Sequence, residues 1–218
     1  FILKCREDKR LLPLIHALES QGVVIQLANR QYLDEKSDGA VHQGIIARVK
    51  PGRQYQENDL PDLIASLDQP FLLILDGVTD PHNLGAIIRT AECAGAHGVI
   101  IPRRRSVGLT AVVGKASAGA LEYMPVARVA NLVATIRDLK ARGIWVFGTA
   151  ADGDTTLTGA DLRGPAAIVI GNEGSGMSRL VAESCDLKVS IPLKGHISSL
   201  NASTAAAVLL YEAVRQRG

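Results

Sequence analysis

Phe71 to Gly95 reads FLLILDGVTDPHNLGAIIRTAECAG, and this stretch predicts the fold of most of the chain. It starts with a continuous apolar run, FLLILDGV, which is typical of a strand buried on both faces of a parallel sheet. After a short polar loop, NLGAIIRTAECAG has the spacing of a helix that Asn83 begins and Gly95 ends. A buried strand that leads into a helix is the repeating unit of a parallel α/β sheet.

The same alternation continues to the C-terminus. After Gly95 we expect, in this order, strand GVIIP, helix LTAVVGKASAGAL, strand YMPVARV, helix NLVATIRDLKARG, strand IWVFGTA, strand PAAIVIGNEGSG with its glycine-rich turn, helix MSRLVAESC, strand LKVSIPL and a last helix within SSLNASTAAAVLLYEAVRQRG. The predicted fold class is therefore α/β, with a mostly parallel sheet that helices cover on both faces.

Residues 1–50 predict a separate, smaller α/β unit. Strands are expected at FILK, VVIQLA and QGIIARVK, and helices at Asp8–Gln21 and in NRQYLDEKS. Residues 51–69 are polar and interrupted by prolines, which predicts a linker containing one helical turn. Because the chain begins without Met and inside a predicted strand, we expect further residues to precede Phe1.

The composition indicates a globular chain without a membrane span. It is 47% hydrophobic and 21% charged, which is enough to bury a core. The net charge of +2 permits a nucleic-acid partner without requiring one, and an aromatic content of 4% provides few platforms for stacking bases. No apolar run approaches 20 residues and no signal peptide is apparent, so we expect a cytoplasmic protein.

The cysteines and histidines predict neither a disulfide framework nor a metal site. Cys5, Cys93 and Cys185 are far apart and in no CxxC arrangement, so we expect ordinary thiols in a reducing compartment. The five histidines form no i,i+4 pair and no cluster with cysteines. An intracellular location also excludes a glycan at the N-x-S sequence that starts at Asn201.

Two glycine-containing segments resemble nucleotide-binding loops only superficially. GLTAVVGKA, at Gly108–Ala116, has five residues between its glycines where a phosphate loop has four, and Ala116 stands where a Ser or Thr would hold magnesium. GNEGSG, at Gly171–Gly176, follows a strand, but its spacing is not GxGxxG, which disfavours a nicotinamide cofactor.

Three other segments carry candidate functional residues. In the first, Asn83 is a natural helix N-cap, whereas Arg89, six residues later among Ile, Ala and Cys, needs a partner. In the second, AAIVIGNEGSGMS, glycines at the end of a strand allow a ligand to approach the backbone, and Glu173 is either a ligand-facing or a solvated turn residue.

The third segment, SIPLKGHISSLNASTAAA, turns at Ser199, Leu200 and Asn201 into an Ala-rich helix. One interpretation is a capped, well-packed core helix, and the other is a polar turn that faces a ligand. The two are compatible, because one turn can cap a helix and also hold a ligand.

Together these segments identify a family. NLGAIIRTA, IGNEGSGM and IPLKGHISSLNASTA are similar, in order and spacing, to motifs one, two and three of the SpoU class of the SPOUT methyltransferases. The resemblance covers about Phe71 to the C-terminus, and residues 1–50 resemble the L30e-like RNA-binding domain that precedes this catalytic domain. The section from Ile87 to Lys194 is richer in Ala and Arg than expected, which favours a divergent or hybrid member.

The resemblance implies a SPOUT methyltransferase domain at 70–218 whose C-terminal segment forms a trefoil knot. The knot would hold S-adenosylmethionine in a tight pocket. The cofactor-binding residues implied by the motifs are Gly171, Asn172, Gly176, Ile191 and Leu200.

The implied reaction is transfer of the cofactor's methyl group to the ribose 2′-hydroxyl of a guanosine in 23S ribosomal RNA, without a metal. Arg89 would grip a neighbouring phosphate and stabilise the developing alkoxide, since a guanidinium scarcely deprotonates. Glu173 would position the hydroxyl or Arg89, Asn83 and Asn201 would hold the geometry, and Ser199 would form the polar edge of the pocket.

The family also implies a homodimer, with the first-motif helix and the C-terminal helix at its interface. Arg103–Arg105, in IPRRRS, are candidates for contact with the RNA backbone or form a solvated edge. The alternatives are a transfer-RNA 2′-O-methyltransferase, a non-catalytic RNA-binding protein and, disfavoured by the glycine spacing, a nucleotide-dependent oxidoreductase.

Overall fold

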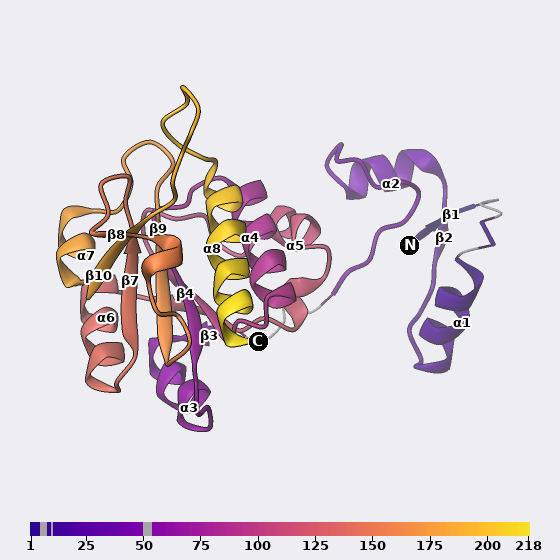
Figure 1. Ribbon diagram of the computed structural model, residues 1–218. Coiled ribbons are helices and arrows are strands. Elements are labelled where there is room, and N and C mark those ends of the chain that lie inside the picture. The colour runs from indigo at the N-terminus through magenta and orange to yellow at the C-terminus, as the bar shows by residue number, and fades with distance from the viewer. Residues whose placement is uncertain (5–7, 10, 50–53) are drawn as a thin grey trace. The chain divides into compact units, whose positions relative to one another are not determined.

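A computed structural model describes residues 1–4, 8–9, 11–49 and 54–218 of the chain, which divides into two compact units, Phe1–Pro51 and Gly52–Gly218. In the first unit, β1 (Ile2–Leu3) pairs in parallel with β2 (Leu27–Ala28), and Ile2 forms an antiparallel bridge with Ile45. Its helices are α1 (Leu12–Ser20) and α2 (Arg30–Lys36) (Figure 1).

The strands predicted in this first unit are shorter than expected. Among the described residues, VVIQLA contributes β2 alone, and QGIIARVK contributes the single bridge at Ile45. Val23 and Val24 are 45% and 81% exposed, so these apolar residues have no buried sheet face to occupy. Strand propensity is realised where side chains pack on a covered surface, and here that surface is small.

The second unit is built on an eight-stranded sheet in which every neighbouring pair is parallel. Its strand order is β3-β6-β5-β4-β9-β7-β10-β8. The strands are β3 (Tyr55–Gln56), β4 (Phe71–Asp76), β5 (Gly98–Pro102), β6 (Val126–Val129), β7 (Trp145–Thr149), β8 (Thr155–Thr156), β9 (Ala166–Gly171) and β10 (Leu187–Ser190). This arrangement confirms the predicted mostly parallel α/β sheet.

The central strand β4 shows why a continuous apolar run was required. Phe71, Leu73 and Leu75 pack into one hydrophobic cluster, while Leu72 and Ile74 pack into the cluster on the opposite face of the sheet. All five are at most 2% exposed. Helices therefore have to cover both faces.

Two groups of helices provide that cover, and Figure 1 shows them on either side of the sheet. One group consists of α4 (Pro81–Cys93), α5 (Ala111–Ala116) and α8 (Ala202–Arg217). The other consists of α3 (Leu60–Ala65), α6 (Leu132–Ala141) and α7 (Arg179–Ser184). Short 3₁₀ turns lie at Glu57–Asp59, Ala120–Glu122 and Leu157–Gly159.

The segment predicted as a linker is, from residue 54 onward, part of the second unit. β3 pairs with β6 at the edge of the sheet, and Leu60 and Ile64 of α3 are buried in the core. The prediction was wrong there because the polar residues dominate the composition, whereas two apolar residues spaced four apart suffice to fix one helix face.

Two helix predictions also need correction. α4 begins at Pro81, and its N-cap is Asp80, whose side chain accepts a hydrogen bond from the backbone N–H of His82 at 2.9 Å. Asn83 is therefore inside the first turn, because Asp followed by Pro is a stronger helix start. The helix predicted in LTAVVGKASAGAL ends at Ala116, since Ala118 and Gly119 have φ of 50° and 93°.

Two of the three cysteines lie in the second unit, and both are free thiols. Cys93 is exposed at the end of α4, and Cys185 is half-buried after α7. Cys5 lies outside the described residues.

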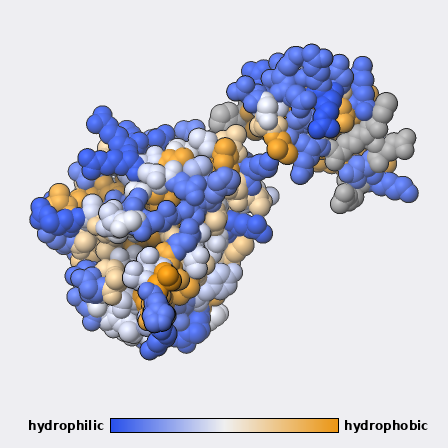
Figure 2. Space-filling view, turned by 90° about the horizontal axis from the view of Figure 1, so that it is seen from above, coloured by the Kyte–Doolittle hydropathy of each residue, from blue (hydrophilic) through white to orange (hydrophobic). Residues whose placement is uncertain are grey.

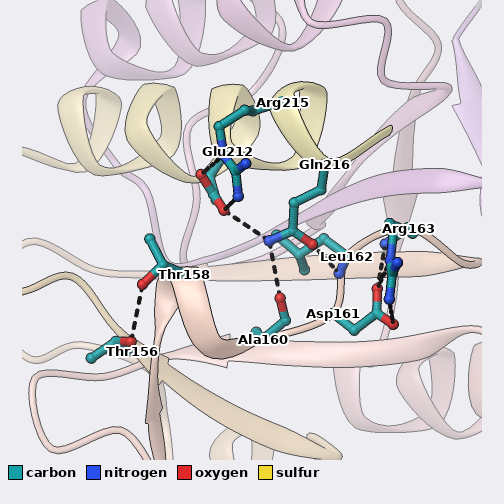
Figure 3. Close-up of polar contacts among 9 residues, drawn as sticks. All are labelled: Thr156, Thr158, Ala160, Asp161, Leu162, Arg163, Glu212, Arg215 and Gln216. Atoms are coloured by element: carbon teal, nitrogen blue, oxygen red, sulfur yellow. Dashed lines mark hydrogen bonds and ion pairs between the residues drawn. The ribbon is translucent and has the colours of Figure 1, made fainter. Parts of the chain in front are cut away.

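The end of α8 is fastened to the loop before β9, as Figure 3 shows. Gln216 Nε2 donates to the carbonyl of Ala160 at 3.0 Å, and Gln216 Oε1 accepts from the N–H of Leu162 at 2.8 Å. Gln216 also donates to Glu212, which forms an ion pair with Arg215 at 2.8 Å. These bonds fix the C-terminal helix against the sheet. Across the described residues, no helix combines the length and apolar character that crossing a bilayer requires.

Candidate active site

The order in which successive strands join the parallel sheet reverses between β4 and β9. β5 and then β6 extend from one side of β4, whereas β9 and then β7 extend from the other. Asp76 at the end of β4 is paired in register with Gly171 at the end of β9. Ligands of open parallel sheets bind at the carboxyl ends of strands where the order reverses, so this edge is the first place to search.

Asn172 ties the loop after β9 to the loop after β4. Its Nδ2 donates to the carbonyl of Gly77 at 2.7 Å, and its Oδ1 accepts from the N–H of Gly174 at 2.9 Å. The backbones of Asn172 and Gly176 exchange two hydrogen bonds of 2.9 Å. Gly77 and Gly176 have φ of +86° and +67°, which L-residues rarely adopt. The glycine-rich turn is thus a fixed structure.

Gly171 permits this turn to close on itself. A Cβ atom at this position would lie 2.7 Å from the carbonyl oxygen of Gly176 and would collide with the backbone of Met177. The glycine is therefore needed for contact between two parts of the same loop. Ligand approach, the reason given by the sequence pattern, is not what excludes a side chain here.

Beside this turn lies a cavity of about 440 Å³. It is lined by the ends of β7, β9 and β10, by the glycine-rich turn and by the segment leading into α8: Thr149, Ala150, Ala151, Ile170, Gly171, Asn172, Glu173, Gly174, Gly176, Val189, Ile191, Leu193, Ser198, Ser199, Leu200, Ala202 and Ala205. The segment between β10 and α8 projects at the top of Figure 1, and Figure 2 looks down on that side, where hydrophobic and hydrophilic residues are both exposed.

All five residues expected to bind the cofactor line this one cavity, as do Glu173 and Ser199. The volume falls in the range typical of small-molecule sites. Among the described lining residues, Glu173 is the only charged one, so the cavity suits a ligand with an apolar body and a cationic group. S-adenosylmethionine is a net cation of this kind, because its sulfonium and ammonium charges outweigh its one carboxylate, and its flat adenine ring is the part suited to the apolar lining.

A polar network joins the three motifs at the edge of the cavity. Asn83 Nδ2 donates to Glu173 Oε1, and Asn201 Nδ2 donates to Asn83 Oδ1 at 3.1 Å. Asn201 Oδ1 at the same time accepts from the backbone N–H of Ser203 at 2.9 Å, which caps α8. The turn before α8 therefore does serve both purposes: it caps the helix and contributes to the network.

Arg89 is separate from this network. It is exposed on α4, does not line the cavity, and makes no hydrogen bond or ion pair with any residue that the structure describes. The sequence left three kinds of partner open for Arg89: a carboxylate, a backbone carbonyl or a phosphate. The described residues provide neither of the first two, because Arg89 lies on the outward face of the helix while its neighbours Ile87 and Ile88 are fully buried. Its guanidinium is free to meet an anion from outside.

Some residues of the site carry no motif in the sequence. Thr149, at the end of β7, donates from Oγ1 to the carbonyl of Val169 at 2.9 Å and lines the cavity. Asp76, at the end of β4, accepts from the N–H of Ser178 at 2.7 Å and so holds the far end of the glycine-rich turn. Their one signal is their position as the last polar residue of a predicted strand.

Comparisons with known proteins agree with this geometry. Residues 70–211 match the family described as SpoU rRNA Methylase, and residues 1–55 match the family described as RNA 2′-O ribose methyltransferase substrate binding. The 23S rRNA (guanosine-2′-O-)-methyltransferase RlmB of Escherichia coli strain K12 is 68% identical over 217 residues, which cover 100% of this chain and 89% of that protein.

Two solved structures share the fold. The SpoU methyltransferase AviRb from Streptomyces viridochromogenes, in complex with AdoMet, has a TM-score of 0.77 at 28% identity, covering 99% of this chain and 81% of that one. The AdoMet-bound rRNA methyltransferase from Sinorhizobium meliloti has a TM-score of 0.75 at 27% identity, covering 94% and 77%. With its parallel sheet, its three joined motifs and matches that span both units, the chain belongs to the SpoU rRNA methylase family.

Proposed function

We propose that this chain transfers a methyl group from S-adenosylmethionine to the ribose 2′-hydroxyl of a guanosine in 23S ribosomal RNA. The observation that carries the proposal is the cavity at the ends of β7, β9 and β10, with the network of Asn83, Glu173 and Asn201 at its edge. The name of the Escherichia coli relative supports the substrate, and the AdoMet complex of AviRb supports the cofactor.

S-adenosylmethionine, when bound, supplies the methyl group and a good leaving group. The chain's part is to bind and orient. Gly171, Asn172 and Gly176 provide a rigid backbone turn, and Ile191 and Leu200 provide apolar walls. Ser199 contributes a hydroxyl at the wall that leads into α8. No metal is needed for this transfer.

Glu173 is suited to orient the attacking hydroxyl. Asn83 holds one of its carboxylate oxygens, and the other, Oε2, has no partner among the described residues. Asn201 fixes Asn83 in turn. A hydroxyl held by that free oxygen would meet the methyl group in a restricted direction, and such alignment removes much of the entropic barrier to displacement.

Arg89 would act on the RNA. Its exposed guanidinium can bind the phosphate next to the target ribose in a bidentate manner and stabilise the oxyanion that develops on the 2′-oxygen. It is not a reasonable base, because an arginine guanidinium stays protonated in proteins. The smaller unit, Phe1–Pro51, would add RNA contacts as an L30e-like domain, and its match to a substrate-binding family supports this.

We also propose a trefoil knot. β10 is separated from β9 by β7 in the sheet, yet α8, which follows β10, packs back against α4 and β9. The segment between β10 and α8 and the glycine-rich turn after β9 line the same cavity. Threading of one through the other would bring both segments to the same cavity.

We expect the chain to act in the cytoplasm, where bacteria make ribosomal RNA. We also expect it to form a homodimer. Val208 and Tyr211 are 39% and 52% exposed on α8, three residues apart and so on one face of the helix. This apolar face supports an interface that includes α8 and its neighbour α4. Light scattering of the purified chain should give the mass of a dimer, and Tyr211→Glu should shift it towards the monomer.

The activity is tested with labelled S-adenosylmethionine and 23S, 16S and transfer RNA that lack the modification. We expect label in 23S RNA alone. Arg89→Lys should lower kcat by at least about tenfold, because an ammonium cannot replace a bidentate guanidinium at a developing charge.

Arg179→Lys is the matched control, since Arg179 is also an exposed helical arginine but pairs with Glu183 at 2.8 Å. It should leave turnover unchanged. Label in transfer RNA alone would keep the chemistry and overturn the substrate. Normal turnover in Arg89→Lys would remove Arg89 from the reaction.

A further inference from the structure

Four arginines gather where β5 and β6 end. Arg103, Arg104 and Arg105 follow β5, and Arg128 lies near the end of β6, in register with Ile101. We call these four residues the arginine cluster. Within the described residues none of them forms an ion pair, whereas Arg163, Arg179 and Arg215 each meet a carboxylate within 2.9 Å.

Arg103 and Arg128 are held side by side by neutral acceptors only. Arg103 Nε donates to the carbonyl of Arg128 at 3.4 Å, and Arg128 Nη2 donates to the carbonyl of Arg103 at 3.4 Å. Arg103 Nη2 also donates to Gln56 Oε1 at 3.1 Å. Arg128 Nε is buried and has no hydrogen-bond partner among the described residues. Neither guanidinium has a carboxylate partner among the described residues, so an anion from outside would stabilise both charges.

The loop that carries the cluster is fixed in place. The N–H of Arg103 donates to the carbonyl of Val129 at 2.8 Å, and Ser106 Oγ donates to the carbonyl of Pro102 at 2.8 Å. Arg105 has φ of 61°, an uncommon conformation for a residue with a side chain. Arg104 and Arg105 are exposed, and neither side chain bonds to any residue in the described part of the chain.

The cluster borders the candidate active site. The N–H of Val107 donates to the carbonyl of Val78 at 3.1 Å, and the carbonyl oxygen of Arg105 lies 3.8 Å from the position that a Cβ of Gly77 would take. Gly77 in turn accepts the hydrogen bond from Asn172, which lines the cavity. A polymer whose ribose is held at the cavity would therefore extend its backbone over this loop.

We propose that the arginine cluster binds phosphates of the RNA chain that flank the target ribose. This rests on the proposed function and names the part of the protein that holds the substrate's backbone. Because phosphate contacts position a nucleic acid without reading its sequence, the cluster sets where the RNA lies and leaves base selection to other residues. Arg103 and Arg128, which are bonded to each other's backbone carbonyls, would bind phosphate at the ends of β5 and β6, and the exposed Arg104 and Arg105 would bind phosphates beside them.

The test uses the double variant Arg104→Gln/Arg105→Gln, because these side chains support no other described part of the fold. The matched control is Arg163→Gln/Arg179→Gln, which removes the same charge from two arginines that already have carboxylate partners. The affinity of each for an unmodified 23S RNA transcript is measured at several salt concentrations, together with the affinity for S-adenosylmethionine.

We expect the slope of log K against log salt to fall by about 0.7 to 0.9 for each phosphate that the variant no longer binds, and the RNA affinity to fall by about tenfold or more. The control should keep the wild-type slope, and both variants should bind S-adenosylmethionine as the wild type does. An unchanged slope in the cluster variant overturns the proposal, and so does a loss of S-adenosylmethionine binding. If the wild type binds RNA with a steep slope but transfers no methyl group, the proposed function fails and the cluster stands.

Discussion

Replacing Gly171 by alanine tests whether close contact between its backbone and that of Gly176 and Met177 is what shapes the glycine-rich turn. The new methyl group would lie 2.7 Å from the carbonyl oxygen of Gly176 and against the backbone of Met177, and backbone atoms cannot rotate away as a side chain can. The turn has to open. Opening breaks the two 2.9 Å hydrogen bonds between Asn172 and Gly176, and it displaces residues that line the cavity.

Overpacking of this kind costs about 1–3 kcal/mol, and the two broken hydrogen bonds cost about 1 kcal/mol each, so we expect a destabilisation of about 3–5 kcal/mol. If about 1.4 kcal/mol of it has to be recovered on binding, the affinity for S-adenosylmethionine falls about tenfold. Urea denaturation measures the first quantity, and isothermal titration calorimetry measures the second.

Two glycines serve as controls. Gly174→Ala, three residues along the same turn, meets nothing closer than 3.7 Å and should leave the free energy of unfolding almost unchanged. Gly164→Ala meets nothing within 4 Å and should leave S-adenosylmethionine binding unchanged. A Gly171→Ala protein with wild-type stability and affinity would refute the argument that this close approach shapes the cavity.

Three further predictions follow from single contacts. Asn201→Asp should keep the helix cap and most of the stability, but it should lose turnover because a carboxylate cannot donate to Asn83. Asn201→Ala should lose turnover and also about 1 kcal/mol of the free energy of unfolding. Methyl transfer measures the turnover, and urea denaturation measures the stability. Burial lowers the pKa of His97 below its usual 6.5, so the unfolded chain binds the proton more readily and the stability should fall as the pH drops below about 6.5. Urea denaturation at pH 7.5 and pH 5.5 measures this loss of stability, and His97→Asn should make it smaller. An identical loss in the variant would contradict the role of His97. Burial raises the pKa of Cys185 to about 11, so iodoacetamide at pH 8 should modify the exposed Cys93 well before it, as peptide mass spectrometry would detect.

The elements that could be predicted from the sequence are those in which one local pattern decides the structure. The run FLLILDGV is apolar at every position of β4 before Asp76, and only burial on both faces explains that. The glycine-rich turn and the turn at Asn201 were predictable because glycines after a strand and an Asn before a helix are typical of such turns. Since parallel strands end at one edge, these turns had to meet there.

The features that sequence missed depend on partners far away in the chain. β3 forms because it pairs with the edge strand β6, and the sequence of Tyr55–Gln56 alone does not predict that pairing. Conversely, VVIQLA has strand propensity, but within the described part of the chain it forms a ladder of two residues. The outward direction of Arg89 depends on which face of α4 packs on the sheet, and the apolar residues on both sides of it concealed that face.

The chemical identity of the product tests directly whether the chain methylates a guanosine ribose. Unmodified 23S RNA is incubated with the chain and S-adenosylmethionine, digested to nucleosides and analysed by mass spectrometry, with Glu173→Gln in parallel. We expect 2′-O-methylguanosine from the wild type and much less from the variant, because Glu173 lines the cavity and is held by Asn83. A methyl group on a base, or an equal yield of 2′-O-methylguanosine from Glu173→Gln, would contradict it.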